Sequence, residues 1–409
     1  MTWLKKLGPG ILLAGAAIGV SHLVQSTRAG AEYGWVMFIA LVVACASKYP
    51  FLDFGTRYTA ATGKNLLYGY RSLGKPALYS YGLITLGTMF IILAAVTLVA
   101  AGLAENLFQL GWSVQFWSIL LLGLCVLIIL GGKYSGLDLA MKIILGVLAV
   151  AVISAVVLAL AKFEASVVQP EKALPVWSLA GLSFVFAFMG WMPIPLDASV
   201  WHSIWILEKK KSQTNTIPTQ WLSDFKTGYF TAVIMAVLFF TLGNLVLFGK
   251  VDALPDNAVA FSAVLIELFS ENLGGWSKRL ISFAAFTAMF STVLSITDAY
   301  PRVGKAWLRM HSKKDSNFQK SFLVFLLVVP AGALCILFFL FTNFKSLIDF
   351  ATGITFLSAP VLAWFNLKLI QNTSIPFNMK PTKNYLSFSK LCLLFLIFSA
   401  LVYLLLLFL

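Results

Sequence analysis

The chain has 409 residues, of which 60% are hydrophobic and only 11% are charged. A soluble domain carries about a quarter charged residues, so this composition excludes an ordinary soluble enzyme and favours a helical membrane protein with many spans. The net charge of +14 is what basic cytoplasmic loops give a membrane protein, so we do not expect nucleic acid as a partner.

Hydropathy predicts eleven spanning helices in a single transmembrane domain covering residues 1–409. With the N-terminus inside, most of the 30 lysines and arginines, Lys48 among them, fall on the cytoplasmic side. The positive-inside rule therefore predicts a cytoplasmic N-terminus and an outside C-terminus in a plasma or bacterial inner membrane, with lipid as the surrounding partner. The approximate limits of the spans are 8–29, 33–52, 77–104, 112–131, 138–161, 178–205, 224–249, 278–300, 319–342, 346–370 and 386–409.

Segment 255–275 is expected to be an amphipathic helix on the outer surface rather than a twelfth span. It begins with a Pro and Asp/Asn start signal, and its apolar residues recur at helical spacing. Asp256, Glu267 and Glu271 disfavour a position inside the membrane.

Two spans carry breaks that predict a transport site. The first has glycines leading to Gly19–His22, and the sixth has Pro193 and Pro195 followed by Asp197, which is placed to restart a helix as an N-cap. A broken backbone is tolerated in a membrane only where it lines a cavity. Breaks five helices apart are typical of inverted-repeat transporters. We therefore predict repeats over about 8–161 and 178–370, with an accessory helix over about 386–409.

Three stretches resemble the Nramp family of divalent-metal transporters. "GPGILLAGAAIGVSHLVQSTRAGAEYGW" (8–35) resembles the family's first helix, "KYPFLDFGTRYTAATGKNLLYGYR" (48–71) its second helix and following loop, and "GWMPIPLDASVWHS" (190–203) its sixth-helix motif. The resemblance implies an all-α integral membrane protein with the LeuT-type fold, in which two inverted five-helix repeats are followed by an eleventh helix.

This chain departs from the family pattern at the site itself. The family's DPGN quartet falls on residues 19–22, so the metal-binding aspartate is Gly19 and the asparagine is His22. Met192 matches the family's thioether ligand, whereas the first motif histidine is Ile194. The sequence therefore resembles a divergent, Nramp-related branch.

The resemblance and the breaks together give a candidate site. The predicted substrate-binding residues are Gly19, Ser21, His22, Met189, Met192 and Asp197. A divalent cation would take His22, Met192 and Asp197 as ligands, because softer ions accept imidazole and thioether while a carboxylate offsets the charge. Proton coupling is left open, with His22, Asp197 and His202 as candidates. Asp197 is equally compatible with a plain N-cap.

No catalytic or ATP-binding motif appears, so neither an enzyme nor a cofactor is expected. The leading prediction is a secondary active transporter of divalent metal cations (the Mn/Fe/Mg class) that works by alternating access between helices one and six. The alternative is a LeuT-type transporter of a small organic solute such as an amino acid, because an uncharged break exposes helix amides to a carboxylate. Structural ion pairs are predicted for Arg28–Glu32, Asp53–Arg57 and Asp298–Arg302.

Overall fold

The computed structural model describes residues 8–131, 134–162, 173–212, 218–249, 254–311, 318–340, 343–371 and 375–409. Within these ranges the chain is helical with short connections, and no strand occurs among them. Side chains are not described for 134–142, 144, 212, 271–272, 311 and 318. A further i,i+4 pair that the sequence predicts, Asp138–Lys142, lies outside the described side chains.

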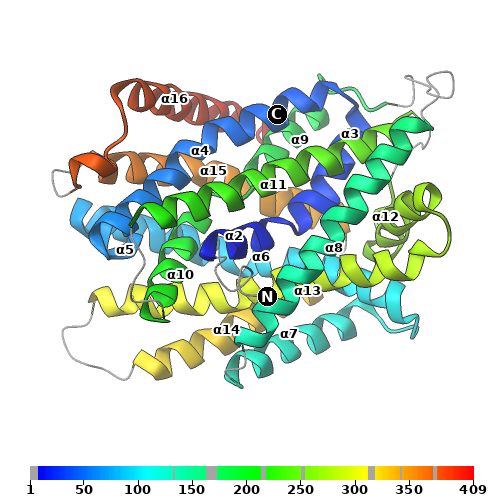
Figure 1. Cartoon of the computed structure of the whole chain (residues 1–409), viewed down its shortest axis with the longest axis horizontal. Helices are drawn as coiled ribbons and strands as arrows, with labels where there is room; N and C mark the ends of the chain where they lie inside the picture. Colours follow the sequence, from blue (N-terminus) through cyan, green and yellow to red (C-terminus); the bar gives the residue numbers. More distant parts are fainter. Residues whose placement is uncertain are drawn as a thin grey trace.

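The helices follow one another in the order drawn in Figure 1. They are α2 (Pro9–Ala17), the π-helical turn η1 (Ser21–Ser26), α3 (Thr27–Tyr33), α4 (Val36–Thr62), α5 (Leu66–Leu73), α6 (Lys75–Phe108), α7 (Val114–Leu130), α8 (Tyr134–Ala161), α9 (Leu179–Trp191), α10 (Ala198–Ser212), α11 (Pro218–Leu247), α12 (Ala258–Leu273), α13 (Ser277–His311), α14 (Phe318–Phe339), α15 (Phe344–Ile370), the 3₁₀ turn η4 (Phe377–Met379) and α16 (Lys383–Leu406).

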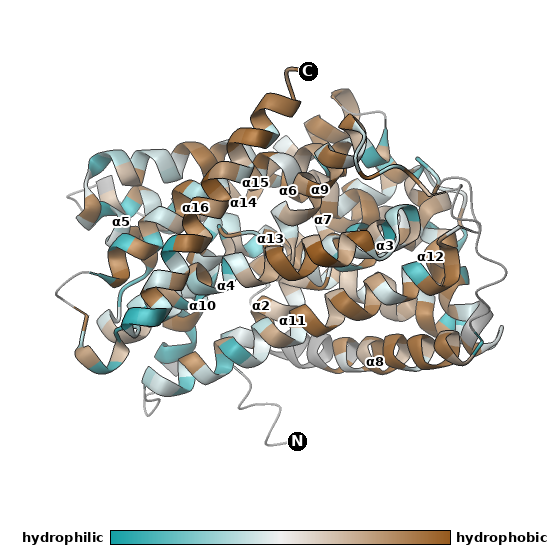
Figure 2. Ribbon diagram, turned by 90° about the horizontal axis from the view of Figure 1, so that it is seen from above, coloured by the Kyte–Doolittle hydropathy of each residue, from teal (hydrophilic) through white to brown (hydrophobic). Residues whose placement is uncertain are grey.

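Seven of the described helices are long and apolar enough to cross a membrane, and the bent pair Pro9–Ala17 and Ser21–Tyr33 makes an eighth. Shorter apolar helices stand at the other predicted spans, including Val114–Leu130 and Leu179–Trp191. Long hydrophobic stretches are visible along the helices in Figure 2. The protein is thus a multi-pass membrane protein, and each of the eleven predicted spans coincides with a helix or a broken helix.

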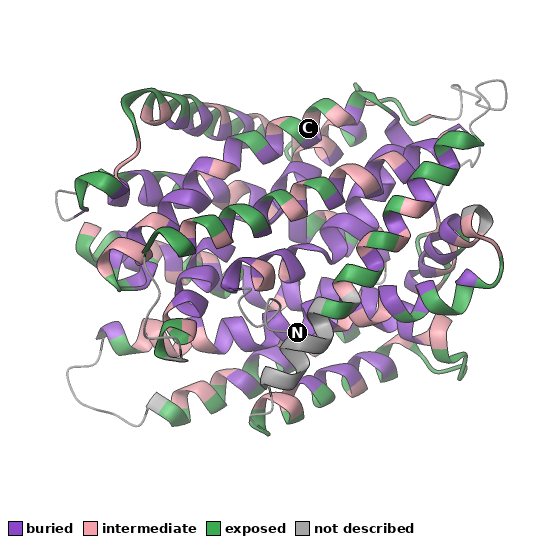
Figure 3. Ribbon diagram, viewed as in Figure 1, coloured by how far each residue is buried: buried purple, intermediate pink, exposed green. Residues whose placement is uncertain are grey.

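The helices divide into central and peripheral ones (Figure 3). In the most apolar stretch of each helix, 72% of α13 and 67% of α6 is buried inside the protein, against 39% of α16 and 28% of α14. Membrane helices expose apolar residues to lipid wherever they do not contact protein. We therefore place α6 and α13 in the interior and α14 and α16 at the periphery.

Two predictions about individual segments can be compared with the structure. The helix expected within 255–275 is present as α12, and Asn257 caps it by accepting from the backbone N–H groups of Val259 and Ala260 at 2.9 and 3.2 Å. The predicted end of the second span at residue 52 was wrong, because α4 continues to Thr62. Lys48 therefore lies in the middle of a buried helix and not at a cytoplasmic end, as the charge count had assumed.

The first predicted span consists of α2, η1 and α3, which together we call helix one. Its backbone approaches that of α11 closely. A Cβ atom added at Gly228 would overlap the carbonyl group of Gly10, and one added at Gly10 would overlap the carbonyl group of Asp224. The Asp224 carboxylate accepts from the N–H groups of Gly8 and Gly10 at 2.9 and 2.6 Å. It thereby caps the free donors at the start of α2 from a neighbouring helix.

We expect Gly228→Ala to lower the melting temperature of the purified protein. The added methyl group must push α11 away from Gly10, and overpacking of this kind typically costs about 1–3 kcal/mol. Gly123→Ala is the matched control, because Gly123 is also helical and a Cβ atom there meets no atom within 4 Å. Equal melting temperatures for the two variants would contradict the close approach.

Candidate functional site

The first break lies where α2 ends at Ala17 and the chain bends by 47° before η1 begins. A Cβ atom at Gly19 would stand 2.8 Å from the Thr292 side chain of α13. Thr292 itself donates to the Gly15 carbonyl oxygen at 3.1 Å. The position that the resemblance gives to a metal-binding aspartate is therefore filled by packing against α13. A π-helical turn directly after the break, as η1 is here, is common at functional sites.

His22 belongs to η1, is fully buried and faces α11. Its Nδ1 lies 2.8 Å from the Ser21 hydroxyl oxygen, and its Nε2 lies 2.8 Å from the carbonyl oxygen of Ala232. Because a carbonyl oxygen only accepts, Nε2 carries a proton in this arrangement. Both ring nitrogens thus have protein partners, and His22 could ligate a metal ion only after releasing one of them.

The second break spans the residues between Trp191, where α9 ends, and Ala198, where α10 begins. Lys48 of α4 reaches this break. Its Nζ donates to the carbonyl oxygens of Met189, Gly190 and Ile194 at 2.8, 3.0 and 3.1 Å, and the residue is 1% exposed. The predicted site residue Met189 therefore contributes a backbone oxygen. Lys48 was not predicted as a site residue, although a lysine followed by further helix-compatible apolar residues was the signal that could have found it.

Asp197 directly precedes α10, where an N-cap was predicted, and is 3% exposed. Its Oδ2 accepts from the Tyr300 hydroxyl at 3.4 Å, and its Oδ1 has no hydrogen-bond partner among the described residues. The second break therefore buries two ionisable groups, Lys48 and Asp197.

Met192 and His202, the two remaining predicted site residues, contact different helices. The Met192 thioether, from the second break, receives a long contact of 3.9 Å from the Ser26 hydroxyl of η1. His202 of α10 has its Nδ1 3.2 Å from Thr56 Oγ1, and its Nε2 has no partner within the described part of the chain. The structure thus brings Met192 next to helix one, whereas His202 faces α4.

A small cavity of about 30 Å³ lies between the two breaks. Ser21 and Val20 line it from helix one, Trp191 and Pro195 from the sixth helix, and Thr292 from α13. The breaks therefore face each other, as predicted. Its volume is enough for about one water molecule.

The cavity lining is mostly apolar and aromatic, and Ser21 and Thr292 are its polar members. None of the described lining residues is charged, and none is a histidine. Two indoles, those of Trp191 and Trp201, line it, and neither Nε1 has a hydrogen-bond partner among the described residues. No group of three or more His, Cys, Asp or Glu residues that could hold a metal occurs in the described ranges. The two indole donors were not predicted from the sequence.

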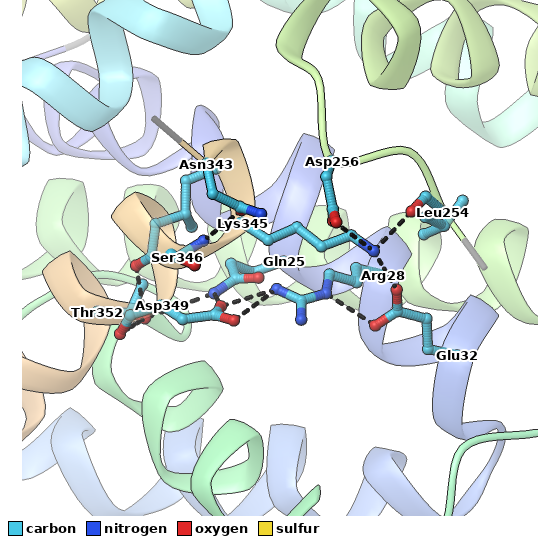
Figure 4. A network of polar contacts seen from close by, with 11 residues as sticks. Gln25, Arg28, Glu32, Leu254, Asp256, Asn343, Lys345, Ser346, Asp349 and Thr352 are labelled. Atoms are coloured by element: carbon cyan, nitrogen blue, oxygen red, sulfur yellow. Dashed lines mark hydrogen bonds and ion pairs between the residues drawn. The ribbon is translucent and has the colours of Figure 1, made fainter. Parts of the chain in front are cut away.

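A network of ion pairs, which we call the Arg28 network, lies at one end of helix one (Figure 4). The Arg28 guanidinium binds both carboxylate oxygens of Asp349 in α15 at 2.8 and 2.9 Å, and Glu32 at 2.8 Å. It also lies 4.4 Å from the ring centroid of Phe184 in α9. Lys345 extends the network, because its Nζ is 3.2 Å from both Glu32 and Asp256.

The three ion pairs predicted from i,i+4 spacing are confirmed. Arg28 binds Glu32, Arg57 binds Asp53 at 2.6 Å, and Arg302 binds Asp298 at 2.6 Å. The partner of Arg28 in α15 was missed, because no sequence spacing relates residues so far apart in the chain.

Comparisons with solved structures identify the fold. No family model matches the chain. The structure is similar to a point mutant of the Eremococcus coleocola manganese transporter, with a TM-score of 0.75 over 98% of this chain and 86% of that chain at 15% identity. It is also similar to MhsT in complex with L-phenylalanine (TM-score 0.67, 98% of each chain, 17% identity) and to Mhp1, a nucleobase-cation-symport-1 family transporter (TM-score 0.59, 97% and 90%, 15% identity). These likenesses show the predicted LeuT-type fold.

A curated sequence shows the family. The "Uncharacterized protein PM0681" of Pasteurella multocida (strain Pm70) is 35% identical over 376 residues, which are 90% of this chain and 86% of that protein. The chain therefore belongs to the same family of LeuT-fold membrane proteins as PM0681.

Proposed function

We propose that the protein is a secondary active transporter whose cargo is a small organic solute with an apolar body and a hydrogen-bond acceptor, such as an amino acid. Cargo would bind between the two broken helices and be exposed to each side of the membrane in turn. We further propose the predicted orientation, with the N-terminus inside and the C-terminus outside.

The observation that carries this proposal is the lining of the cavity between the breaks. Ligand sites for organic molecules are mostly apolar and aromatic, with a few placed polar groups. The Trp191 and Trp201 side chains supply that surface, and their Nε1–H groups are buried donors without partners. Since leaving such donors unpaired costs free energy, an acceptor oxygen on the cargo would satisfy them.

The charges at the second break argue against a divalent cation. The carbonyl oxygens that the broken helix frees are already bound to the Lys48 ammonium. A divalent cation added there would meet a fixed positive charge with Asp197 as the neighbouring carboxylate. Burying uncompensated charge is costly. A zwitterion or neutral solute adds no net charge and avoids this cost.

A second cavity supports a path for the cargo. It measures about 300 Å³ and lies between α6, α13 and α14. Tyr300 both lines this cavity and donates to Asp197 at the break. In our proposal this second cavity is the inner part of the path of the cargo through the protein. The Arg28 network closes the outer part of that path.

Divalent metal transport is the second candidate, and specific observations favour it. The Nramp-like motifs and the fold shared with a manganese transporter point to it, and the Met192 thioether is turned toward helix one. This candidate requires His22 and Lys48 to leave their present partners. Under it, His22 and Asp197 would act as ligands, and proton coupling through His22, Asp197 or His202 would be an open addition.

Titration calorimetry of the purified protein against a panel of amino acids, Mn²⁺ and Mg²⁺ tests the proposal. We expect a hit among the organic solutes and none among the metals. Trp201→Phe should weaken that hit by roughly three- to tenfold, which corresponds to the loss of one hydrogen bond of about 0.5–1.5 kcal/mol. Trp276→Phe should leave it unchanged, because Trp276 is 75% exposed. Binding of Mn²⁺ with silence from every organic solute would instead establish the second candidate.

If the Arg28 network closes the outer part of the path, weakening it should let a reagent outside the cell reach the cavity between the breaks. We place a cysteine at Val20, which lines the cavity, and label intact cells with a membrane-impermeant thiol reagent. In that background Asp349→Asn should speed labelling about tenfold, if closure loses roughly 1.4 kcal/mol of pairing free energy.

Asp256→Asn is the matched control for the labelling experiment. Its side chain is 61% exposed, and exposed ion pairs contribute little, so labelling should stay slow. Equal rates in the two variants would show that the network does not close the site. Labelling only after permeabilisation would show that the network faces the cytoplasm.

A further inference from the structure

The Lys48 ammonium is fully satisfied by backbone oxygens. An ammonium group has three N–H donors, and the Nζ of Lys48 has three carbonyl partners, from Met189, Gly190 and Ile194, within 3.1 Å. All three oxygens belong to the sixth-helix segment on both sides of Pro193. One side chain from α4 thus joins the end of α9 to Ile194 within the break.

These carbonyl oxygens are free for a physical reason. The last carbonyl groups of α9 have no N–H partner further along the helix, and Pro193 and Pro195 supply no N–H at all. The end of a helix carries partial negative charge, which favours a cation. In apolar surroundings such oxygens must find a donor or a cation, so the break is a site for a positive charge.

Asp197 is a second ionisable group on the same broken segment and is 3% exposed. Its Oδ1 has no hydrogen-bond partner among the described residues. The direct partners of Lys48 are thus the three carbonyl oxygens.

We propose that Lys48 is a tethered cation, whose ammonium group permanently fills the carbonyl site of the broken sixth helix that an exchangeable ion would otherwise occupy. In consequence the end of α9 and the break that follows it keep their relative position without a bound sodium or metal ion. Lys48 is a positioning residue in this role. The inference goes beyond the proposed function: it holds for any organic cargo and excludes the divalent-metal candidate, which requires Lys48 to leave these oxygens.

Removing the tether should create a site for a small free ammonium ion. Lys48→Ala should lower the melting temperature of the purified protein by several degrees, because three buried oxygens lose their donor. Methylammonium chloride should restore the temperature in a saturable manner, since binding to the folded state alone stabilises it. Tetramethylammonium chloride at equal ionic strength should not, because it has no N–H donor.

Two further variants make the test specific. Lys48→Met keeps the length of the side chain but has no donor, so it should be destabilised and not restored by methylammonium. Lys64→Ala, which removes an exposed lysine next to α4, should behave as the unmodified protein. Full stability of Lys48→Met, or failure of methylammonium to restore a monodisperse Lys48→Ala protein, would overturn the proposal.

A further experiment uses the unmodified protein, so its result does not depend on whether a variant folds. Its melting temperature should be the same in sodium, potassium and choline chloride, and millimolar Mn²⁺ should not raise it. Saturable stabilisation by sodium or Mn²⁺ alone would show that an exchangeable cation occupies the carbonyl site, contrary to the proposal. Because the readout is the melting temperature, a failed titration with organic solutes would leave this result unchanged, whereas stabilisation by Mn²⁺ would count against both proposals.

Discussion

The structure depends on how the broken sixth helix satisfies its backbone inside the membrane. Free carbonyl groups in an apolar bundle cost several kcal/mol each unless a donor or ion meets them. Here a single lysine from α4 meets three of them. α9 ends at Trp191 and α10 starts at Ala198, and this contact ties the end of α9 to Ile194 in the break between the two helices. It also determines the electrostatics of the site, because the fixed ammonium opposes any cation that approaches the same oxygens.

The two ends of helix one are held by different forces, which suits alternating access. Near Gly10, the helix is fixed to α11 by a backbone contact that leaves no room for a methyl group. Beyond the break, Arg28 is held by carboxylates of α3 and α15. Close packing is not easily undone, whereas ion pairs can exchange protein partners for water when a gate opens. We therefore expect the part of helix one beyond the break to move more than the part before it.

The features predicted correctly from the sequence are those encoded by local spacing. The clustered glycines and the double proline predicted both breaks, and i,i+4 spacing predicted the pairs Asp53–Arg57 and Asp298–Arg302. The contacts that define the site join distant parts of the chain, so no spacing encodes them: Lys48 with the sixth helix, and Arg28 with Asp349. Lys48 was also assigned to the cytoplasmic side because the second span was ended too early. The roles of His22, Met192 and Asp197 in binding a metal stay predictions.

The most direct test of the account is an experimental structure determined with Mn²⁺ present and anomalous scattering recorded at the manganese edge. The account predicts no anomalous peak between the two breaks, with the Lys48 ammonium still bound to the carbonyl oxygens of Met189, Gly190 and Ile194. A peak bonded to the Met192 sulfur, to Asp197 or to those carbonyl oxygens, with the Lys48 side chain displaced, would contradict it.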